Sequence, residues 1–305
     1  MQHTEQGNIL DVIIIGGSYA GLSAAMALGR SLRKVLIIDD GLPCNRQTPH
    51  SHNFLTQDGR PPAEISALGK ERVLAYPSIT WLDDRAVKAE PSTTGFTVKT
   101  KHGDVLRAKK IILATGIQDN LPSIPGFRDC WGITVIHCPY CHGYEFRNEP
   151  TAIFAQGERA LHLASLVRNL TSQVTIVTSG ASGFDSTQLA KLKRNDVILV
   201  EEELRSIIHQ KGKIESLELN NGEHLAVTAL YAAVPFTQMS DLHKQLGCEE
   251  SDQGYIKVDN FQKTNVPGVY ACGDNSAMMR SVANAVYTGN LTGAMVNKEL
   301  VDEQF

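Results

Sequence analysis

The apolar positions near the start of the chain predict a strand, a turn and a helix. Residues 11–15 form a short apolar run, residues 16–21 are small and rich in glycine, and residues 22–29 combine apolar and small side chains as in a helix. A second apolar run over residues 34–38 predicts another strand, which ends at Asp39. This alternation is typical of a parallel sheet in an α/β protein.

The predicted turn carries a dinucleotide-binding pattern, with candidate contacts at Gly16, Ser18, Ala20, Gly21 and Asp39. Gly16 would make the tight turn, and Gly21 would allow the helix to pack closely on the strand. Asp39 follows Gly16 by 23 residues, near the interval of about 20 that precedes the acid bound to a ribose hydroxyl. Ser18 replaces the second glycine of the pattern, and a glycine-rich turn in an unrelated α/β unit is the alternative.

Two later segments favour a flavin dinucleotide. The first is a predicted strand, residues 109–113, that leads into an Ala-Thr-Gly turn. The second, residues 267–274, ends in Gly-Asp before a helix that is predicted from about Ser281. The carboxylate of Asp274 can accept a hydrogen bond from a ribityl hydroxyl at the end of such a strand.

Composition and charge narrow the class of protein. The 305 residues are 42% apolar and 20% charged, which predicts a globular chain of about two domains. A net charge of −4, with no run of five like charges, argues against nucleic acid and anionic membranes as partners. The first apolar run follows no basic segment and is short, so we expect no signal peptide, no membrane span and a cytoplasmic protein.

Of the six cysteines, Cys138 and Cys141 form a Cys-x-x-Cys motif. A zinc site would need a second ligand pair, which the sequence lacks, and the Cys-x-x-Cys-His pattern of c-type haem attachment normally accompanies export. Two reduced structural thiols are a third alternative. In a reducing compartment the motif favours a redox-active disulfide, and no metal is expected. The other four cysteines are expected to be inert and buried.

The order of these motifs along the whole chain resembles that of the FAD-dependent disulfide oxidoreductases of the low-molecular-weight thioredoxin reductase type. The string Cys-Pro-Tyr-Cys-His-Gly-Tyr-Glu, residues 138–145, is more similar to the subgroup of dithiol oxidases that act on gliotoxin- and holomycin-type compounds. The resemblance implies an α/β fold of two Rossmann-like nucleotide-binding domains, the second inserted in the first. Residues 1–120 and 238–305 would form the FAD-binding domain, and residues 121–237 an NAD(P)-binding-like domain that carries the cysteines. A homodimer is also implied.

The resemblance assigns roles to the cysteine motif. Cys141 would face the flavin and exchange electrons with it, and Cys138 would form the mixed disulfide with the substrate. His142 stands where thioredoxin reductases usually have an aspartate, and an imidazole is a suitable proton carrier for thiol–disulfide exchange. Glu145 is a second candidate for that task, and an ordinary surface histidine is the alternative for His142.

The resemblance also implies which residues contact FAD. The loop over residues 46–59, which includes His52, would lie over the flavin, and Ser281 stands where thioredoxin reductases usually have a glutamine. The implied cofactor contacts are Gly16, Ser18, Ala20, Gly21, Asp39, Arg46, Asn53, Val87, Thr115, Gly116, Gly273, Asp274, Ser281 and Val282.

Residues 155–160 occupy the place of the nucleotide-binding turn in the implied second domain, and they fit NADPH poorly. Ala155 replaces the turn glycine, and an alanine at positive φ costs energy that glycine does not. Glu158 adds a carboxylate where the pyrophosphate would lie, and no arginine for a 2′-phosphate follows closely after Val177. The sequence therefore predicts weak or absent NADPH binding.

Without NADPH, electrons must reach or leave the flavin by another route. Either a small dithiol reduces the cysteine pair and FAD passes the electrons to oxygen, or a ferredoxin feeds FAD and the pair reduces a small disulfide or a thioredoxin-like protein. Ferredoxins are usually acidic, so the acidic net charge of this chain favours the oxidase direction. A thioredoxin reductase fed by NADPH or ferredoxin, and a non-catalytic FAD redox sensor or electron carrier, are the alternatives.

Overall fold

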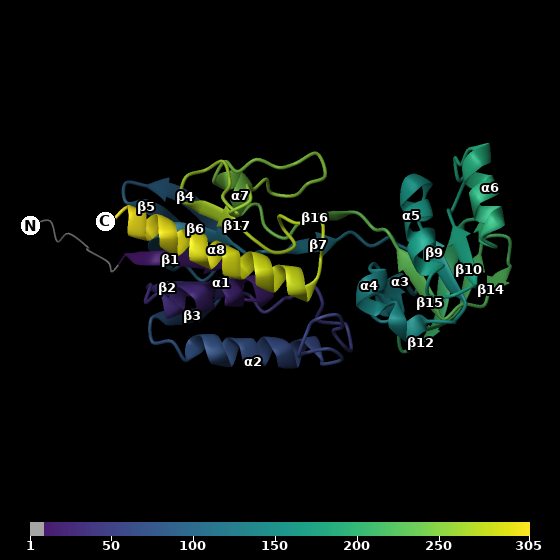
Figure 1. Cartoon of the computed structure of the whole chain (residues 1–305), viewed down its shortest axis with the longest axis horizontal. Coiled ribbons are helices and arrows are strands. Elements are labelled where there is room, and N and C mark those ends of the chain that lie inside the picture. The colour runs from purple at the N-terminus through teal and green to yellow at the C-terminus, as the bar shows by residue number, and fades with distance from the viewer. Residues whose placement is uncertain (1–8) are drawn as a thin grey trace, which may run out of the picture. The chain divides into compact units, whose positions relative to one another are not determined.

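The computed structural model describes residues 9–305 and divides the chain into two compact units (Figure 1). The first unit comprises the chain up to Arg46, then Phe54–Gln118 and Phe236–Phe305. The second unit comprises Gln47–Asn53 and Asp119–Pro235. The resemblance places residues 47–53 in the first domain. In the structure they group with the second unit, because their side chains pack on that unit. Residues 1–8 of that implied domain lie outside the described residues.

A seven-stranded sheet forms the centre of the first unit. Its order is β3-β2-β1-β6-β5-β4, and β17 pairs with the second half of β6. All pairings are parallel except those of β4 with β5 and of β5 with β6. The strands are β1 (Leu10–Ile15), β2 (Val35–Asp39), β3 (Ile79–Asp83), β4 (Ala86–Ser92), β5 (Gly95–Thr100), β6 (Val105–Leu113) and β17 (Val269–Ala271).

Both faces of this sheet are covered, which explains why its central strands are apolar throughout. Val12 and Ile14 of β1 face a layer of helices, while Ile13 and Ile15 pack against β4, β5 and the short helix α7. The helices of the first unit are α1 (Tyr19–Arg30), α2 (Pro62–Leu74), α7 (Leu242–Gln245) and α8 (Val282–Asp302). In the part of the chain that the structure describes, no helix has both the length and the apolar character to cross a membrane.

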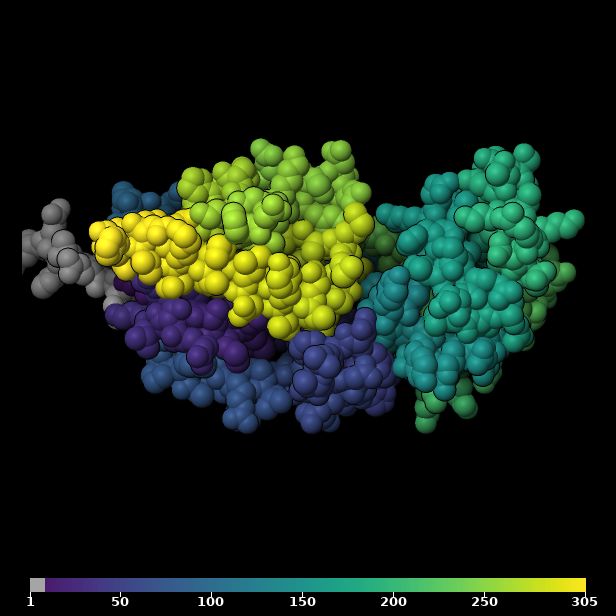
Figure 2. All heavy atoms as spheres, in the orientation of Figure 1, coloured from purple at the N-terminus to yellow at the C-terminus, as the bar shows by residue number. Residues whose placement is uncertain are grey.

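Helices α1 and α8 lie side by side, and their small residues allow this close approach (Figures 1 and 2). A Cβ added at Gly289 of α8 would lie 2.1 Å from the carbonyl oxygen of Ala20 in α1. One added at Gly293 would lie 2.5 Å from the carbonyl oxygen of Ala24. The small side chains predicted for the first helix therefore serve its packing against α8 as well as against the sheet.

The second unit is built on five parallel strands in the order β11-β10-β9-β15-β8, with an antiparallel sheet β12-β13-β14 on one face and α5 on the other. The Rossmann-type α/β architecture predicted from the sequence is confirmed. The strands are β8 (Val135–Ile136), β9 (Thr151–Phe154), β10 (Val174–Val177), β11 (Ile198–Val200), β12 (Leu204–Gln210), β13 (Lys213–Leu219), β14 (His224–Leu225) and β15 (Ala229–Ala232). The helices are α3 (Phe127–Cys130), α4 (Pro139–His142), the 3-10 helix η1 (Tyr144–Phe146), α5 (Gly157–Val167) and α6 (Ser186–Arg194). The strands β7 (Ile117–Asp119) and β16 (Phe236–Gln238), where the chain passes between the units, pair with each other.

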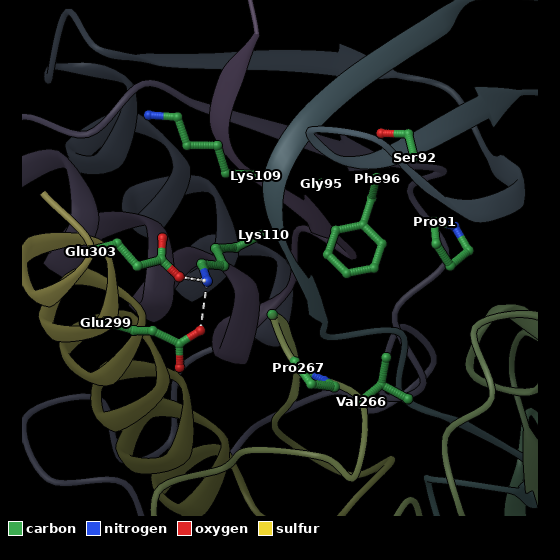
Figure 3. A pocket seen from close by; sticks show the side chains of 11 residues that line it. Pro91, Ser92, Gly95, Phe96, Lys109, Lys110, Val266, Pro267, Glu299 and Glu303 are labelled. Carbon is green, nitrogen blue, oxygen red and sulfur yellow. Dashed lines mark hydrogen bonds and ion pairs between the residues drawn. The ribbon is translucent and has the colours of Figure 1, made fainter.

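A buried ion-pair network fixes the end of α8 to the sheet of the first unit. Lys110 of β6 donates to Glu299 at 2.6 Å and also to Glu303, beside a pocket of about 330 Å³ (Figure 3). Glu299 accepts two further hydrogen bonds, from Lys263 and from the Tyr270 hydroxyl, each at 2.6 Å. Burial alone would raise the pKa of Glu299, but these hydrogen bonds lower it to about 2.

We expect Glu299→Gln to lower the free energy of unfolding by about 3 kcal/mol at pH 7, because it leaves the Lys110 ammonium buried with a weakened partner. The folded-state pKa of Glu299 lies below the unfolded value of about 4.3, so its stabilisation is present above that pH and is lost as the pH falls toward 2. Urea unfolding at several pH values measures both effects. Glu303→Gln is the matched control, because Glu303 is half exposed, and should cost less than about 1 kcal/mol. Equal losses in the two variants would contradict the assignment.

Candidate functional site

The structure brings the two cysteines of the motif together in the second unit. Cys138 is the N-cap of α4, and the backbone N–H of Cys141 donates to the carbonyl oxygen of Cys138 at 3.2 Å. Their Sγ atoms lie 2.8 Å apart, and both side chains are half-buried. A disulfide requires about 2.05 Å between the sulfurs, so two-electron oxidation would join them with only a small movement. Within residues 9–305, no three His, Cys, Asp or Glu side chains are grouped as metal ligands.

Two histidines and a glutamate of the second unit form a cluster next to the helix that carries this pair. His142 ends α4, Glu145 belongs to η1, and His52 is carried by residues 47–53. Nε2 of His52 lies 3.6 Å from Oε1 of Glu145, and the His52 and His142 rings meet edge to face with centroids 6.1 Å apart. The sequence points to His142 and Glu145, but it places His52 only in a loop near the flavin.

Burial sets the protonation state of His142. It lowers the pKa of the imidazole because the charged form loses its hydration, the nearby His52 lowers it further, and the Glu145 carboxylate opposes both effects. His142 is therefore neutral at pH 7 and able to accept a proton from a thiol that is being deprotonated.

Tyr231 is a buried neighbour of the site that sequence reasoning missed. It lies on β15, is 1% exposed, and its hydroxyl would lie 3.0 Å from a Cβ added at Gly143. Burial raises the pKa of this phenol, and the negative charges of Cys138 and Glu145 raise it further. It is thus a protonated donor next to the site. A lone tyrosine in an apolar strand carries no sequence signal of such a position.

The glycine-rich turn of the first unit has the geometry that its pattern predicts. Gly16 has a φ of +105°, and a Cβ there would lie 2.2 Å from the carbonyl oxygen of Ala114. A Cβ at Gly21 would lie 1.9 Å from the carbonyl oxygen of Gly16. Ser18 is the N-cap of α1 and its side chain makes no capping hydrogen bond. The first backbone N–H groups of α1, including that of Ala20, are thus available to an anionic group such as a pyrophosphate.

The predicted ribose-binding acid lies at the mouth of this turn. The Asp39 carboxylate accepts from the backbone N–H of Gly17 at 2.8 Å and of Gly41 at 3.2 Å. A carboxylate can accept about four hydrogen bonds, so the Asp39 oxygens can also accept from the hydroxyl groups of a ribose.

Val87, another predicted cofactor contact, lies near the start of β4 with its side chain exposed, and its carbonyl oxygen accepts from Gln245 at 3.3 Å.

The Gly273-Asp274 turn follows β17, as predicted. The Asp274 carboxylate is 3.7 Å from Sγ of Cys44 and 3.9 Å from Nε of Arg280. The next residue, Asn275, is fully buried, and its Nδ2 donates to the carbonyl oxygen of Leu113 at 2.8 Å and to Thr115 at 3.3 Å.

Oδ1 of Asn275 is buried without a hydrogen-bond partner among the described residues, as is Oε1 of Gln238. Nε2 of that glutamine donates to the carbonyl oxygens of Gly254 and Asn275. Buried acceptors without donors are rare in folded proteins. Their presence next to the Thr115-Gly116 and Gly273-Asp274 turns fits a site that takes a polar cofactor, and FAD has the donors required.

The remaining predicted cofactor contacts have local structural tasks. Ser281 is the N-cap of α8, where its Oγ accepts from the backbone N–H of Asn284 at 3.1 Å, and Val282 begins that helix. Arg46 is exposed in the first unit and donates to the carbonyl oxygen of Pro43 at 3.0 Å. Asn53 groups with the second unit and has a φ of +58°.

The turn after β9 in the second unit differs from the prediction in one respect. Ala155 does not adopt positive φ, so the prediction of backbone strain at this alanine is wrong. The left-handed residue is Gly157, with a φ of +56°, two positions further along. Because a glycine supplies that conformation, the turn forms without penalty.

Glu158 places a carboxylate at this turn, and two further carboxylates lie in the segments that follow β10 and β11. Glu158 in the first turn of α5 accepts from Nε2 of Gln188 in α6 at 2.7 Å. Glu201, which follows β11, accepts from the backbone N–H of Ser182, in the loop after β10, at 2.7 Å. Asp185 caps α6 by accepting from the backbone N–H of Gln188 at 2.8 Å. Glu158 thus places a carboxylate at the N-terminus of α5, where a dinucleotide would place its pyrophosphate, and Glu201 is held against the loop that follows β10.

Comparison with known proteins gives consistent matches over almost the whole chain. The family model described as pyridine nucleotide-disulphide oxidoreductase matches residues 10–289. The chain is 32% identical over 311 residues to thioredoxin reductase tcpT of Claviceps purpurea, with 96% of this chain and 95% of that protein covered. It is 29% identical to thioredoxin reductase aclD of Aspergillus oryzae, with 97% and 98% covered. The crystal structure of an oxidoreductase from Agrobacterium tumefaciens is 37% identical, with a TM-score of 0.91 and 96% and 99% covered.

Proposed function

The chain belongs to the pyridine nucleotide-disulphide oxidoreductase family, as an FAD-dependent disulfide oxidoreductase of thioredoxin reductase type, and on this premise we propose that it is a dithiol oxidase. It oxidises a small dithiol through Cys138 and Cys141 and uses oxygen, not NADPH, as its redox partner. The FAD-binding domain implied by the resemblance, residues 1–120 and 238–305, holds FAD. The protein works as a homodimer.

The observation that carries the proposal is the carboxylate-lined turn of the second unit. Dinucleotide phosphates bind at a helix N-terminus because its N–H groups and dipole attract negative charge. At α5 the Glu158 carboxylate lies in that position, held by Gln188, and Glu201 is held against the loop after β10. The Glu158 carboxylate would repel a phosphate at the N-terminus of α5, and Glu201 adds a second negative charge beside the loop after β10.

The substrate reacts at the sulfur atoms of the oxidised pair. One substrate thiolate attacks Sγ of Cys138, which breaks the Cys138–Cys141 bond, forms a mixed disulfide and releases Cys141 as a thiolate. The second substrate thiolate then attacks the substrate sulfur of that mixed disulfide, and the oxidised substrate leaves with its own internal disulfide. Two electrons remain on the cysteine pair, and His142 accepts a substrate thiol proton and passes it on.

FAD, when bound, supplies the two-electron acceptor that restores the disulfide and can pass the electrons to oxygen. The residues that would hold it are the turn of Gly16 to Gly21, Asp39, the Thr115-Gly116 turn and Asp274. They share their place at the carboxyl ends of the parallel strands, where α/β sheets bind their ligands, and each offers a backbone N–H or a carboxylate there.

Exposed aromatic side chains suit a small organic substrate. Tyr140 lies between the two cysteines and is 69% exposed, and Tyr144 is 66% exposed with Arg147 stacked on its ring at 4.1 Å. Such side chains offer flat, amphipathic contact area next to the reacting sulfurs.

Asp274→Ala should weaken the retention of FAD at least about tenfold, because it removes a charge-assisted hydrogen bond to the ribityl chain. The measurement is the fraction of flavin that remains with the protein after dialysis at moderate urea concentration. Asp104→Ala, in the exposed turn between β5 and β6, is the matched control and should retain the flavin fully. Equal retention in both variants would remove Asp274 from the site.

Oxygen consumption tests the proposed activity directly. The purified yellow protein in air-saturated buffer should consume oxygen catalytically with dithiothreitol as the dithiol, and the Cys138→Ser variant should not. Turnover that requires NADPH and thioredoxin would identify a thioredoxin reductase instead. A flavin that dithiols reduce without catalytic oxygen consumption and without thioredoxin reduction would indicate a redox sensor or electron carrier.

A further inference from the structure

We propose that His52 is a positioning residue of the dithiol site, which shares the Glu145 carboxylate with His142 so that protonation of one imidazole opposes protonation of the other. The inference deepens the proposed function and rests on it for the catalytic task of His142. It assigns a role to a residue that lies 86 positions before the first cysteine of the motif.

The segment that carries His52 is fixed to the second unit. Its side chains fill the space over Gly132, where an added Cβ would lie 2.9 Å from Cγ of Gln47 and 3.0 Å from Oγ1 of Thr48. Ser51 next to His52 is buried, with 6% of its surface exposed. The imidazole of His52 is therefore held in place by a packed segment and is not the tip of a free loop.

The Glu145 carboxylate has two imidazole neighbours, His52 and His142. His52 approaches it at 3.6 Å, and the His142 ring lies edge to face with the His52 ring. Other titratable groups near this cluster are His50 on the same segment, with its ring centroid 6.4 Å from that of His52, the Tyr231 phenol from β15, and the Cys138 thiol, whose charge acts on Tyr231 together with that of Glu145. Burial keeps the phenol neutral near pH 7, and Glu145 is the carboxylate that acts on His142.

The consequence concerns proton transfer. When His52 is neutral, the Glu145 charge favours a proton on His142, as is needed while a thiol of the pair or of the substrate is deprotonated. When His52 is protonated, it binds Glu145 and its own charge disfavours the His142 imidazolium. The direction of the His142 pKa, lowered by His52 and raised by Glu145, agrees with this arrangement.

Three substitutions in the reduced holoprotein separate this role from a merely structural one. The measurement is an NMR titration of protein with isotope-labelled histidine, which gives the pH at which the His142 imidazole is half protonated. The His142 signal is assigned by its loss in a His142→Gln variant. His52→Gln should raise the midpoint by about 0.5, the size expected for a screened charge at this distance. Glu145→Gln should lower it by a similar amount. His50→Gln, the matched control on the same segment, should leave it unchanged.

Opposite shifts in the His52 and Glu145 variants support the inference, whereas loosened packing would not produce them. An unchanged midpoint in His52→Gln, or the same shift in His50→Gln, would overturn it. Should His52→Gln fail to fold, His52→Asn and the Glu145 variant give the same comparison. The NMR midpoint does not depend on turnover, so a protein that lacks oxidase activity but shows the opposite shifts would refute the proposed function alone.

Discussion

Cys138→Ser is expected to lower the rate of dithiol oxidation at least about a thousandfold, because the sulfur that accepts the substrate thiolate is gone and no other group can form the mixed disulfide. On the assignment that Cys141 exchanges electrons with the flavin, this variant leaves a thiolate next to oxidised flavin. It should therefore show a long-wavelength charge-transfer absorption band that grows with pH as the thiol ionises. Cys141→Ser should lose turnover equally and lack the band.

A third thiol of the second unit provides the control. Cys130 is fully buried in α3, and burial raises the pKa of its thiol to about 11, so it stays protonated and unreactive at neutral pH. Cys130→Ala should keep dithiol oxidation within about twofold of the parent rate. If the band arises in Cys141→Ser and not in Cys138→Ser, the two roles are exchanged. If Cys130→Ala loses turnover as the motif variants do, the pair is not the reactive site.

NADPH is expected to leave the flavin oxidised under anaerobic conditions, whereas dithiothreitol bleaches it. Two or three lost phosphate contacts, at about 1.5–3 kcal/mol each, move a micromolar ligand toward millimolar affinity. The structure adds the repulsion of Glu158, which is held by Gln188 in the first turn of α5, and the negative charge of Glu201, which is held against the loop after β10. The measurement is the decay of the flavin absorbance band during titration with each reductant.

A gain-of-function variant makes this test sharper. Glu158→Ala combined with Glu201→Arg removes both carboxylates and adds one cation, so NADPH should bleach the flavin at least about tenfold faster than in the parent protein. Glu202→Gln, which removes a charge from the adjacent position, is the control and should leave the slow rate unchanged. Rapid, saturable bleaching of the parent protein by micromolar NADPH would contradict the proposed oxidase.

The sequence by itself determined the α/β class, the order of strand, turn and helix at the start, and the family. Each of these depends on local pattern. Apolar runs of four or five residues specify buried parallel strands, and the Gly16 to Gly21 turn is specified by its own steric needs. The Cys138/Cys141 pair is also local, because one turn of helix brings the two thiols together wherever α4 lies.

Tertiary structure alone decided which distant groups surround those motifs. His52 and Tyr231 reach the dithiol site from segments 86 residues before and 93 residues after Cys138, and no periodicity links them to it. The tertiary structure also decided the conformation of the turn at Ala155. The left-handed residue of this turn is Gly157, so the backbone strain that the nucleotide-binding pattern implied at Ala155 does not arise. Side-chain partners of a site depend on packing between elements far apart in sequence, and a single sequence does not record that packing.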